Sequence, residues 1–121
     1  MKKILVVDDE IAIQDIFNRK LVNSGHQIIY ASSADEAIRA LRNERFDIMF
    51  LDYNLDIHDR SITSEPVVEY IKTSCSVVEW IVFMSNNREK AEKLKNILGF
   101  GEVCIKLDLV CANTIVEVVN G

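Results

Sequence analysis

The stretch KILVVDDE at residues 3–10 decides the fold class of this chain. After Lys3 comes an unbroken apolar run that ends at Val7, and three acidic residues follow it directly. A run that is apolar at successive positions, rather than at alternate ones, is typical of a strand buried on both faces of a parallel sheet. Comparable runs recur farther along the chain, at residues 27–31, 47–51, 79–84 and 102–105.

Helical periodicity fills the segments between these predicted strands. In the first segment Ile13, Phe17 and Leu21 recur at helical spacing, and Gly25 follows as a residue that can end a helix. Polar residues that can cap the later helices are Ser33, Ser64, Asn86 and Asp108. Strict alternation of five strands with five helices predicts an α/β fold, (βα)5, doubly wound around a five-stranded parallel sheet.

The composition limits the class of protein. With 121 residues, of which 49% are hydrophobic and 27% charged, the chain has the size and make-up of one globular domain. We therefore expect residues 1–121 to form a single domain, with no residues left for an output domain. Its 14 basic and 19 acidic residues give a net charge of −5, which disfavours nucleic acid and anionic membranes as direct partners.

Hydropathy and cysteine usage indicate where the protein works. The apolar runs are far shorter than the ~20 residues that a membrane-spanning helix needs. The three cysteines, Cys75, Cys104 and Cys111, show no CxxC spacing. This pattern suits reduced thiols, so we expect a cytoplasmic protein.

Charged and polar residues follow the predicted strands at the point where each strand ends. These are Asp8, Asp9 and Glu10 after the first strand, Asp52 after the third, Ser85 after the fourth and Lys106 after the fifth. Ligands of open α/β sheets bind beyond the carboxyl ends of the strands, so we expect these side chains to share one site.

Such a site is suited to phosphoryl transfer. Three close carboxylates repel one another unless a cation lies between them, and an all-oxygen donor set favours Mg²⁺. A metal held by Asp9 and Asp52 leaves the second oxygen of Asp52 free to attack phosphorus. Lys106 could then neutralise the phosphoryl oxygens, and Ser85 could donate a hydrogen bond to one of them.

The runs ILVVDDE, DIMFLD, VFMS and CIK, in this order and at these strand ends, resemble the receiver domain of two-component response regulators over the whole chain. The resemblance implies a flavodoxin-like strand order, 2-1-3-4-5. It also implies that a histidine kinase or a histidine phosphotransfer protein phosphorylates Asp52. The residues that it implies for the site are Asp8, Asp9, Asp52 and the backbone carbonyl of Asn54 as Mg²⁺ ligands, with Ser85 and Lys106 as contacts of the phosphoryl group. A downstream protein, which the sequence does not identify, would bind the face formed by the fourth helix, the fifth strand and the fifth helix.

Three features depart from that family's usual pattern. Leu107 stands where a proline usually follows the lysine, and Val103 stands where an aromatic residue is common. The polar segment 53–64, which we predict to be an irregular loop, is longer than usual and contains Asp56, His58 and Arg60. These departures leave the phosphorylation chemistry intact but indicate altered signal transmission.

Two alternatives therefore stay open. The first is a pseudo-receiver, an interaction domain that keeps the fold but works without phosphorylation. The second is a Mg²⁺-dependent phosphohydrolase with Asp52 as nucleophile. The second is disfavoured because Asn54 occupies the position where such enzymes carry an acid/base carboxylate. We expect no enzyme activity beyond self-catalysed phosphorylation and dephosphorylation.

Overall fold

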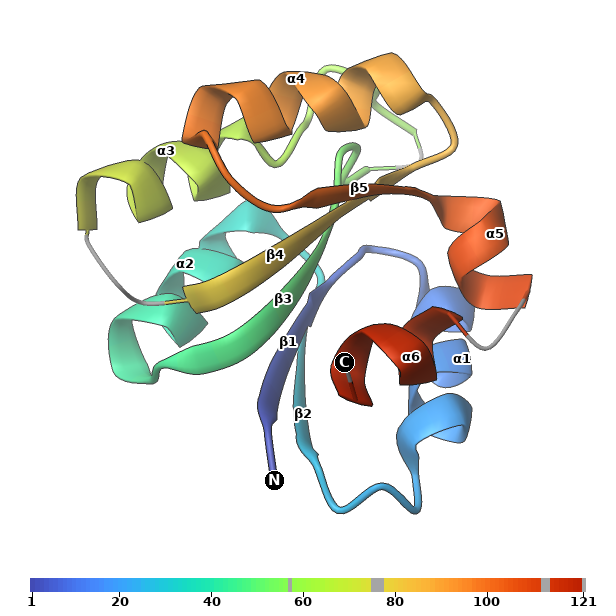
Figure 1. The fold of residues 1–121 in the computed structure, drawn as a ribbon. Coiled ribbons are helices and arrows are strands. Elements are labelled where there is room, and N and C mark those ends of the chain that lie inside the picture. The colour runs from blue at the N-terminus through green and yellow to red at the C-terminus, as the bar shows by residue number, and fades with distance from the viewer. Residues whose placement is uncertain (57, 75–77, 112–113, 121) are drawn as a thin grey trace.

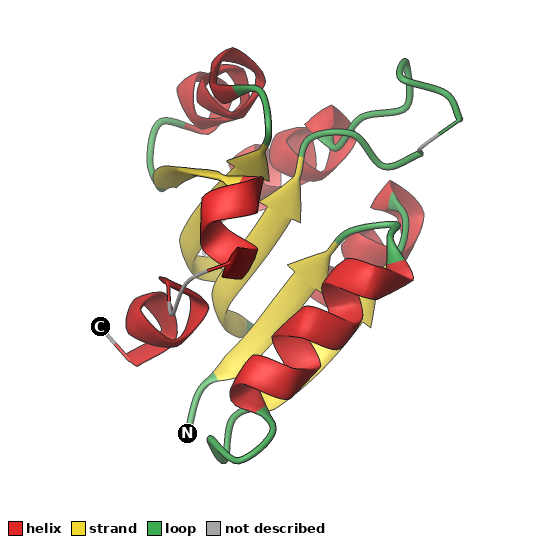
Figure 2. Ribbon diagram, turned by 90° about the vertical axis from the view of Figure 1, so that its right-hand side faces the viewer, coloured by secondary structure: helices red, strands yellow, loops and turns green. Residues whose placement is uncertain are grey.

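Five parallel strands form one sheet between two layers of helices in this computed structural model (Figure 1, Figure 2). The structure describes residues 1–56, 58–74, 78–111 and 114–120. The strands are β1 (Lys3–Val7), β2 (Gln27–Ala31), β3 (Phe46–Asp52), β4 (Val78–Ser85) and β5 (Glu102–Ile105). Their order is β2-β1-β3-β4-β5 and all four pairings are parallel, which confirms the doubly wound sheet and its 2-1-3-4-5 order.

Helices cover both faces of the sheet. They are α1 (Ile11–Leu21), α2 (Ala34–Asn43), α3 (Glu65–Ser74), α4 (Arg88–Leu98), α5 (Lys106–Cys111) and α6 (Thr114–Asn120). One core cluster joins the sheet to α2, α3 and α4, and a second joins it to α1, α5 and α6. Ile4 and Leu5 belong to different clusters because successive side chains of a strand point to opposite faces. Among the described residues, no helix has both the length and the apolar character to span a bilayer.

The register of the central strands sets the positions of the acidic residues. In β1 and β3, Val7 pairs with Leu51, so the residues that follow each of them, Asp8 and Asp52, lie next to each other. In β4 and β5, Ser85 pairs with Ile105, which puts Lys106 just beyond the same edge. The pairing of apolar residues inside the sheet therefore brings the polar residues together outside it.

The C-terminal helix differs from its prediction. We expected one helix capped by Asp108, but α5 begins at Lys106, directly after β5. The backbone turns into the helix at the lysine itself, because Leu107, unlike the proline usual at that position, leaves the preceding residue free to adopt helical angles. Helical structure resumes in α6 at Thr114, and residues 112–113 lie outside the described residues.

The segment 53–64 is not the irregular loop that its polarity predicts. Asn54 and Thr63 form an antiparallel bridge, and the flanking hydrogen bonds run from Leu55 N–H to the Ile62 carbonyl and from Ser64 N–H to the Tyr53 carbonyl. Two apolar residues anchor this hairpin, since Tyr53 and Leu55 are both buried. We call the described residues of this segment, 53–56 and 58–64, the β3–α3 hairpin.

Two predicted helix caps are also wrong in detail. Asn87, not Asn86, caps α4, and its side chain accepts a hydrogen bond from Lys90 N–H. Ser64 starts α3 through its backbone carbonyl, whereas its hydroxyl is buried and has no hydrogen-bond partner among the described residues. Ser33 caps α2 as predicted, through a hydrogen bond from Glu36 N–H.

Gly101, at the entry to β5, is required by both backbone angle and space. Its φ of +110° is strained for any residue with a side chain, and an added Cβ would lie 2.8 Å from the Ile81 carbonyl oxygen. Gly99, which ends α4 with a φ of +95°, has open space at the same place.

Gly101→Ala should therefore destabilise the protein more than Gly99→Ala. We expect about 1 kcal/mol for Gly99→Ala, from backbone strain alone, and about 3 kcal/mol or more for Gly101→Ala, where a backbone clash is added. Urea unfolding of both variants beside the wild type measures the difference. Equal losses would show that the close approach to Ile81 has no cost.

Candidate functional site

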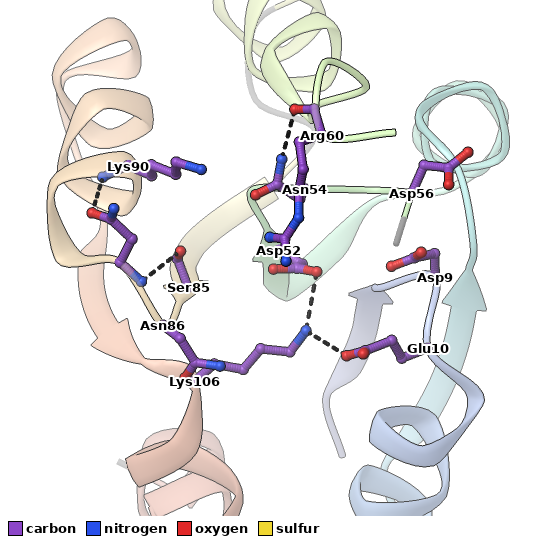
Figure 3. Close-up of a pocket in the computed structure, with 11 residues that line it drawn as sticks. Asp9, Glu10, Asp52, Asn54, Asp56, Arg60, Ser85, Asn86, Lys90 and Lys106 are labelled. Carbon is purple, nitrogen blue, oxygen red and sulfur yellow. Dashed lines mark hydrogen bonds and ion pairs between the residues drawn. The ribbon is translucent and has the colours of Figure 1, made fainter. Parts of the chain in front are cut away.

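A cavity of about 380 Å³ opens at the carboxyl edge of the sheet (Figure 3). Its polar lining comes from the last residues of β3 and β4, the segments after β1, β3 and β4, the first turn of α4 and the first residue of α5. The lining residues are Asp9, Glu10, Asp52, Asn54, Asp56, Arg60, Ser85, Asn86, Asn87, Lys90 and Lys106. The structure thus gathers around one cavity all the predicted site residues except Asp8, which is fully buried behind it.

Three carboxylates form the acidic part of the site. Asp8, Asp9 and Asp52 each present an oxygen, and these three oxygens lie within 4.8 Å of one another. Asp8 is held in place by three hydrogen bonds: its Oδ1 accepts from Glu10 N–H, its backbone N–H donates to the Ala31 carbonyl, and its carbonyl accepts from the Gln14 side chain. Asp52 is 6% exposed, so solvent screens its charge poorly.

Lys106 supplies the positive charge nearest to these carboxylates. Its Nζ lies 2.8 Å from Asp8 Oδ2, 3.0 Å from Glu10 Oε2 and 3.1 Å from Asp52 Oδ2. The contacts with Glu10 and Asp52 are hydrogen bonds, and the contact with Asp8 is an ion pair. Burial alone would lower the pKa of Lys106, but Asp52 and Asp8 outweigh burial and raise it. The lysine is therefore a fixed cation.

One lysine does not balance the negative charge. Burial, with the neighbouring Asp8 carboxylate, raises the pKa of Asp52 from 3.8 to about 7, although Lys106 acts in the opposite direction. Burial also raises the pKa of Asp8 against the opposing effect of Lys106. The site in this state has a deficit of positive charge, which a cation would relieve.

The donor set fits a hard divalent ion. It consists of carboxylate oxygens, and among the described residues neither histidine nor cysteine lines the cavity. Mg²⁺ prefers such oxygen ligands and commonly binds through a few carboxylates together with water. The predicted ligands Asp8, Asp9 and Asp52 would hold it, and Asn54, whose carbonyl is the fourth predicted ligand, lies on the same cavity at the base of the hairpin.

A pair of hydrogen bonds connects the serine and lysine sides of the site. Ser85 Oγ accepts from Asn87 N–H at 3.0 Å, which holds the start of α4 against the end of β4. Asn86 Oδ1 accepts from Leu107 N–H at 3.0 Å, which ties the β4–α4 turn to the residue after Lys106. Proline, usual at the position of Leu107, has no N–H for this bond.

Asp56, Arg60 and Lys90 line the cavity, although the sequence does not predict them as members of the site. The first two come from the β3–α3 hairpin, whose folding back over the site leaves no signal in a polar, aperiodic sequence. Lys90 extends from the first turn of α4, and its Nζ lies over the Tyr53 ring, 5.5 Å from the centroid. Asn87 caps this turn, whereas the sequence predicts its neighbour Asn86 as the cap.

Asp52→Asn should stabilise the metal-free protein and weaken its pH dependence. Because the pKa of Asp52 is raised to about 7, the folded protein holds a proton that the unfolded chain releases near pH 4. Stability therefore falls as the pH rises from 4 to 7, and the variant escapes this loss. We expect a gain of about 2 kcal/mol at pH 8 and little gain at pH 4. Thermal melts in EDTA at both pH values measure it, and a large loss of stability at pH 8 would contradict the charge-deficit argument.

Comparisons with known proteins agree with this arrangement. A family model described as the cyclic-phosphate processing receiver domain matches residues 3–99. The alkaline phosphatase synthesis transcriptional regulatory protein PhoP of Bacillus subtilis is 43% identical over 54 residues, which are 45% of this chain and 22% of that protein. The chain thus matches only about a fifth of the length of this curated relative.

Solved structures match the chain over nearly its full length. The receiver domain of NtrX from Brucella abortus has a TM-score of 0.78 and 27% identity, over 97% of this chain and 94% of that one. The chemotaxis protein CheY4 of Vibrio cholerae has a TM-score of 0.75 and 20% identity, over 99% of this chain and 97% of that one, a likeness of fold. The chain therefore belongs to the cyclic-phosphate processing receiver domain family and has the fold of response-regulator receivers.

Proposed function

We propose that this receiver domain accepts a phosphoryl group on Asp52, with Mg²⁺ as cofactor, from a histidine kinase or a histidine phosphotransfer protein. The observation that carries the proposal is the position of Asp52. Its carboxylate is buried at an open cavity, within ligand distance of Asp8 and Asp9 and 3.1 Å from the ammonium of Lys106. A nucleophile, a cation site and a fixed positive charge are the parts that phosphoryl transfer needs.

The transfer step follows from these groups. An oxygen of Asp52 attacks the donor phosphorus, and the bond from phosphorus to the donor's leaving group breaks. The leaving group departs with the bonding electron pair, as neutral imidazole from a phosphohistidine that is protonated on its other ring nitrogen, or as acetate from acetyl phosphate. A bound Mg²⁺ would neutralise part of the phosphoryl charge, and Lys106 would neutralise another part. Asp52 must be ionised to attack, so its raised pKa slows the reaction below about pH 7 until a cation counters the charge deficit.

Signalling would use the link between the two sides of the site. A phosphoryl group on Asp52 competes with the carboxylates for Lys106 and offers an acceptor to the Ser85 hydroxyl. Ser85 is bonded to Asn87 at the start of α4, and Asn86 is bonded to Leu107 in α5. A change at the phosphoryl group can therefore reach the α4-β5-α5 face, which we propose as the surface for a downstream protein. In this role the domain works in the cytoplasm by protein contact, without binding nucleic acid or membrane itself.

The family description adds a second candidate, action on a cyclic phosphate ester at the same site. The cations Arg60, Lys90 and Lys106 line the cavity, so an anionic phosphate ester is electrostatically acceptable there. Incubation with a 2′,3′-cyclic nucleotide and Mg²⁺, followed by phosphorus NMR, tests this candidate. Ring opening that is lost in Asp52→Asn would support it, and an unchanged spectrum would remove it.

The proposed function first predicts phosphorylation of Asp52. Incubation with Mg²⁺ and acetyl phosphate should add one phosphoryl group to the wild type and none to Asp52→Asn, as intact mass spectrometry measures. Glu36→Gln, on the exposed surface of α2 away from the cavity, is a control with the same loss of one charge. A phosphoryl group retained in Asp52→Asn would exclude Asp52 as the acceptor. No uptake by the wild type would favour the pseudo-receiver.

The proposed function also predicts that Mg²⁺ binds at the carboxylates. Mg²⁺ should raise the melting temperature of the wild type at pH 8, because binding relieves the repulsion between the carboxylates. The rise should shrink at pH 5.5, where the raised pKa of Asp52 lets a proton compete with the metal. Asp9→Asn should lose most of the rise at pH 8. A rise of the same size at both pH values, or in Asp9→Asn, would place the bound Mg²⁺ elsewhere.

A further inference from the structure

The β3–α3 hairpin brings a third cation to the phosphoacceptor cavity, in addition to the lysines. Arg60 stands in its turn, and Figure 3 shows the side chain running past Asn54 into the cavity toward Asp52. Arginine presents parallel N–H donors that match two oxygens of a phosphoryl group. Arg60 is exposed, but it also lines the cavity, so its guanidinium can contact a phosphoryl group that enters there.

Hydrogen bonds fix the backbone from which Arg60 extends. The Asn54 side chain donates from Nδ2 to the Arg60 carbonyl at 3.0 Å. On the other side of the turn, Asp59 Oδ1 accepts from the Ser61 N–H and hydroxyl, and Ile62 N–H donates to the Asp59 carbonyl. Because the turn is braced on both sides of Arg60, less conformational entropy is lost when its side chain binds a ligand.

The other cations of the cavity already have partners. Lys106 is surrounded by three carboxylates, and Lys90 lies over the Tyr53 ring. Within the part of the chain that the structure describes, no ion pair or hydrogen bond engages the Arg60 guanidinium. Arg60 can thus bind an incoming anion without giving up an existing contact, whereas Lys106 must release a carboxylate to do so.

The charge balance also calls for a further cation. Asp9, Glu10, Asp52 and Asp56 face Arg60, Lys90 and Lys106 around the cavity. An approaching phosphodonor carries about two negative charges at neutral pH and would meet the carboxylates before any lysine is free. The Arg60 guanidinium lines the same cavity as Asp9 and Glu10, the acidic residues that follow β1, and its positive charge offsets this repulsion.

We propose that Arg60 binds the phosphoryl oxygens of the donor and of phosphorylated Asp52 directly, as a cationic contact supplied by the β3–α3 hairpin. This inference rests on the proposed function and adds a specific binding residue to it. Arg60 binds the group that is transferred, while Lys106 and the Mg²⁺ site neutralise charge on the side of Asp52. The transfer step is unchanged: a bond forms between an Asp52 oxygen and phosphorus, and the bond from phosphorus to the donor's leaving group breaks.

The test compares Arg60→Ala with the wild type in acetyl phosphate. Removal of one charge-assisted contact should raise the donor concentration for half-maximal phosphorylation about tenfold and leave the rate at saturation nearly unchanged. Arg60→Lys should recover part of the loss. The affinity for beryllofluoride, a phosphoryl mimic, should fall about as much, as fluorine NMR measures.

Controls separate direct contact from other causes. Arg39→Ala removes the same charge from the exposed face of α2 and should behave as the wild type. The Mg²⁺-induced rise in melting temperature should persist in Arg60→Ala, since the metal ligands remain. Equal half-saturation in Arg60→Ala and wild type, or an equal loss in Arg39→Ala, would overturn the inference. Failure of the wild type to take up phosphate would overturn the proposed function itself, and the inference with it.

Discussion

The ammonium of Lys106 among three carboxylates is the interaction on which the site depends. Asp8, Glu10 and Asp52 all lie within 3.1 Å of it, and two of them are buried. One positive charge cannot balance three negative charges in a poorly screened site. Burial, together with the Asp8 carboxylate, raises the pKa of Asp52 despite the opposing effect of Lys106. Because of that deficit, the metal-free site attracts a cation, and Asp52 is harder to ionise until a cation binds. A buried ion pair whose only role was to stabilise the fold would have equal positive and negative charge.

The fold enforces this imbalance through strand register. Leu51 is buried between Val7 and Phe83 in the sheet, so Asp52 cannot move away from Asp8 without breaking the core. Lys106 is fixed in the same way by the pairing of Ser85 with Ile105. Core packing energy thus holds like charges together, which is how an active site keeps an arrangement that its own electrostatics oppose.

The periodic pattern of apolar residues predicts the strands, the helices and the sheet. It does not predict local structure that depends on a few backbone hydrogen bonds. Apolar strands that end in polar residues were sufficient to predict the parallel sheet and the residues gathered at its carboxyl edge. The β3–α3 hairpin could not be predicted because its pairing depends on a few backbone hydrogen bonds and on two buried side chains, Tyr53 and Leu55, in a polar segment. The early start of α5 and the role of Asn86 were not predicted because both depend on local backbone geometry. The start of α5 depends on the backbone angles that Leu107 leaves open to Lys106, and the contact of Asn86 depends on the Leu107 N–H.

The central claim is that Lys106 and a divalent cation neutralise the same carboxylates. The most direct measurement is the rise in melting temperature on Mg²⁺ addition at pH 8.5, for the wild type and Lys106→Met. Methionine keeps much of the length of lysine without its charge, so the metal-free variant should melt lower, yet Mg²⁺ should raise its melting temperature more than that of the wild type. An equal or smaller rise in Lys106→Met would contradict the account, because the lysine and the metal would then act on different charges.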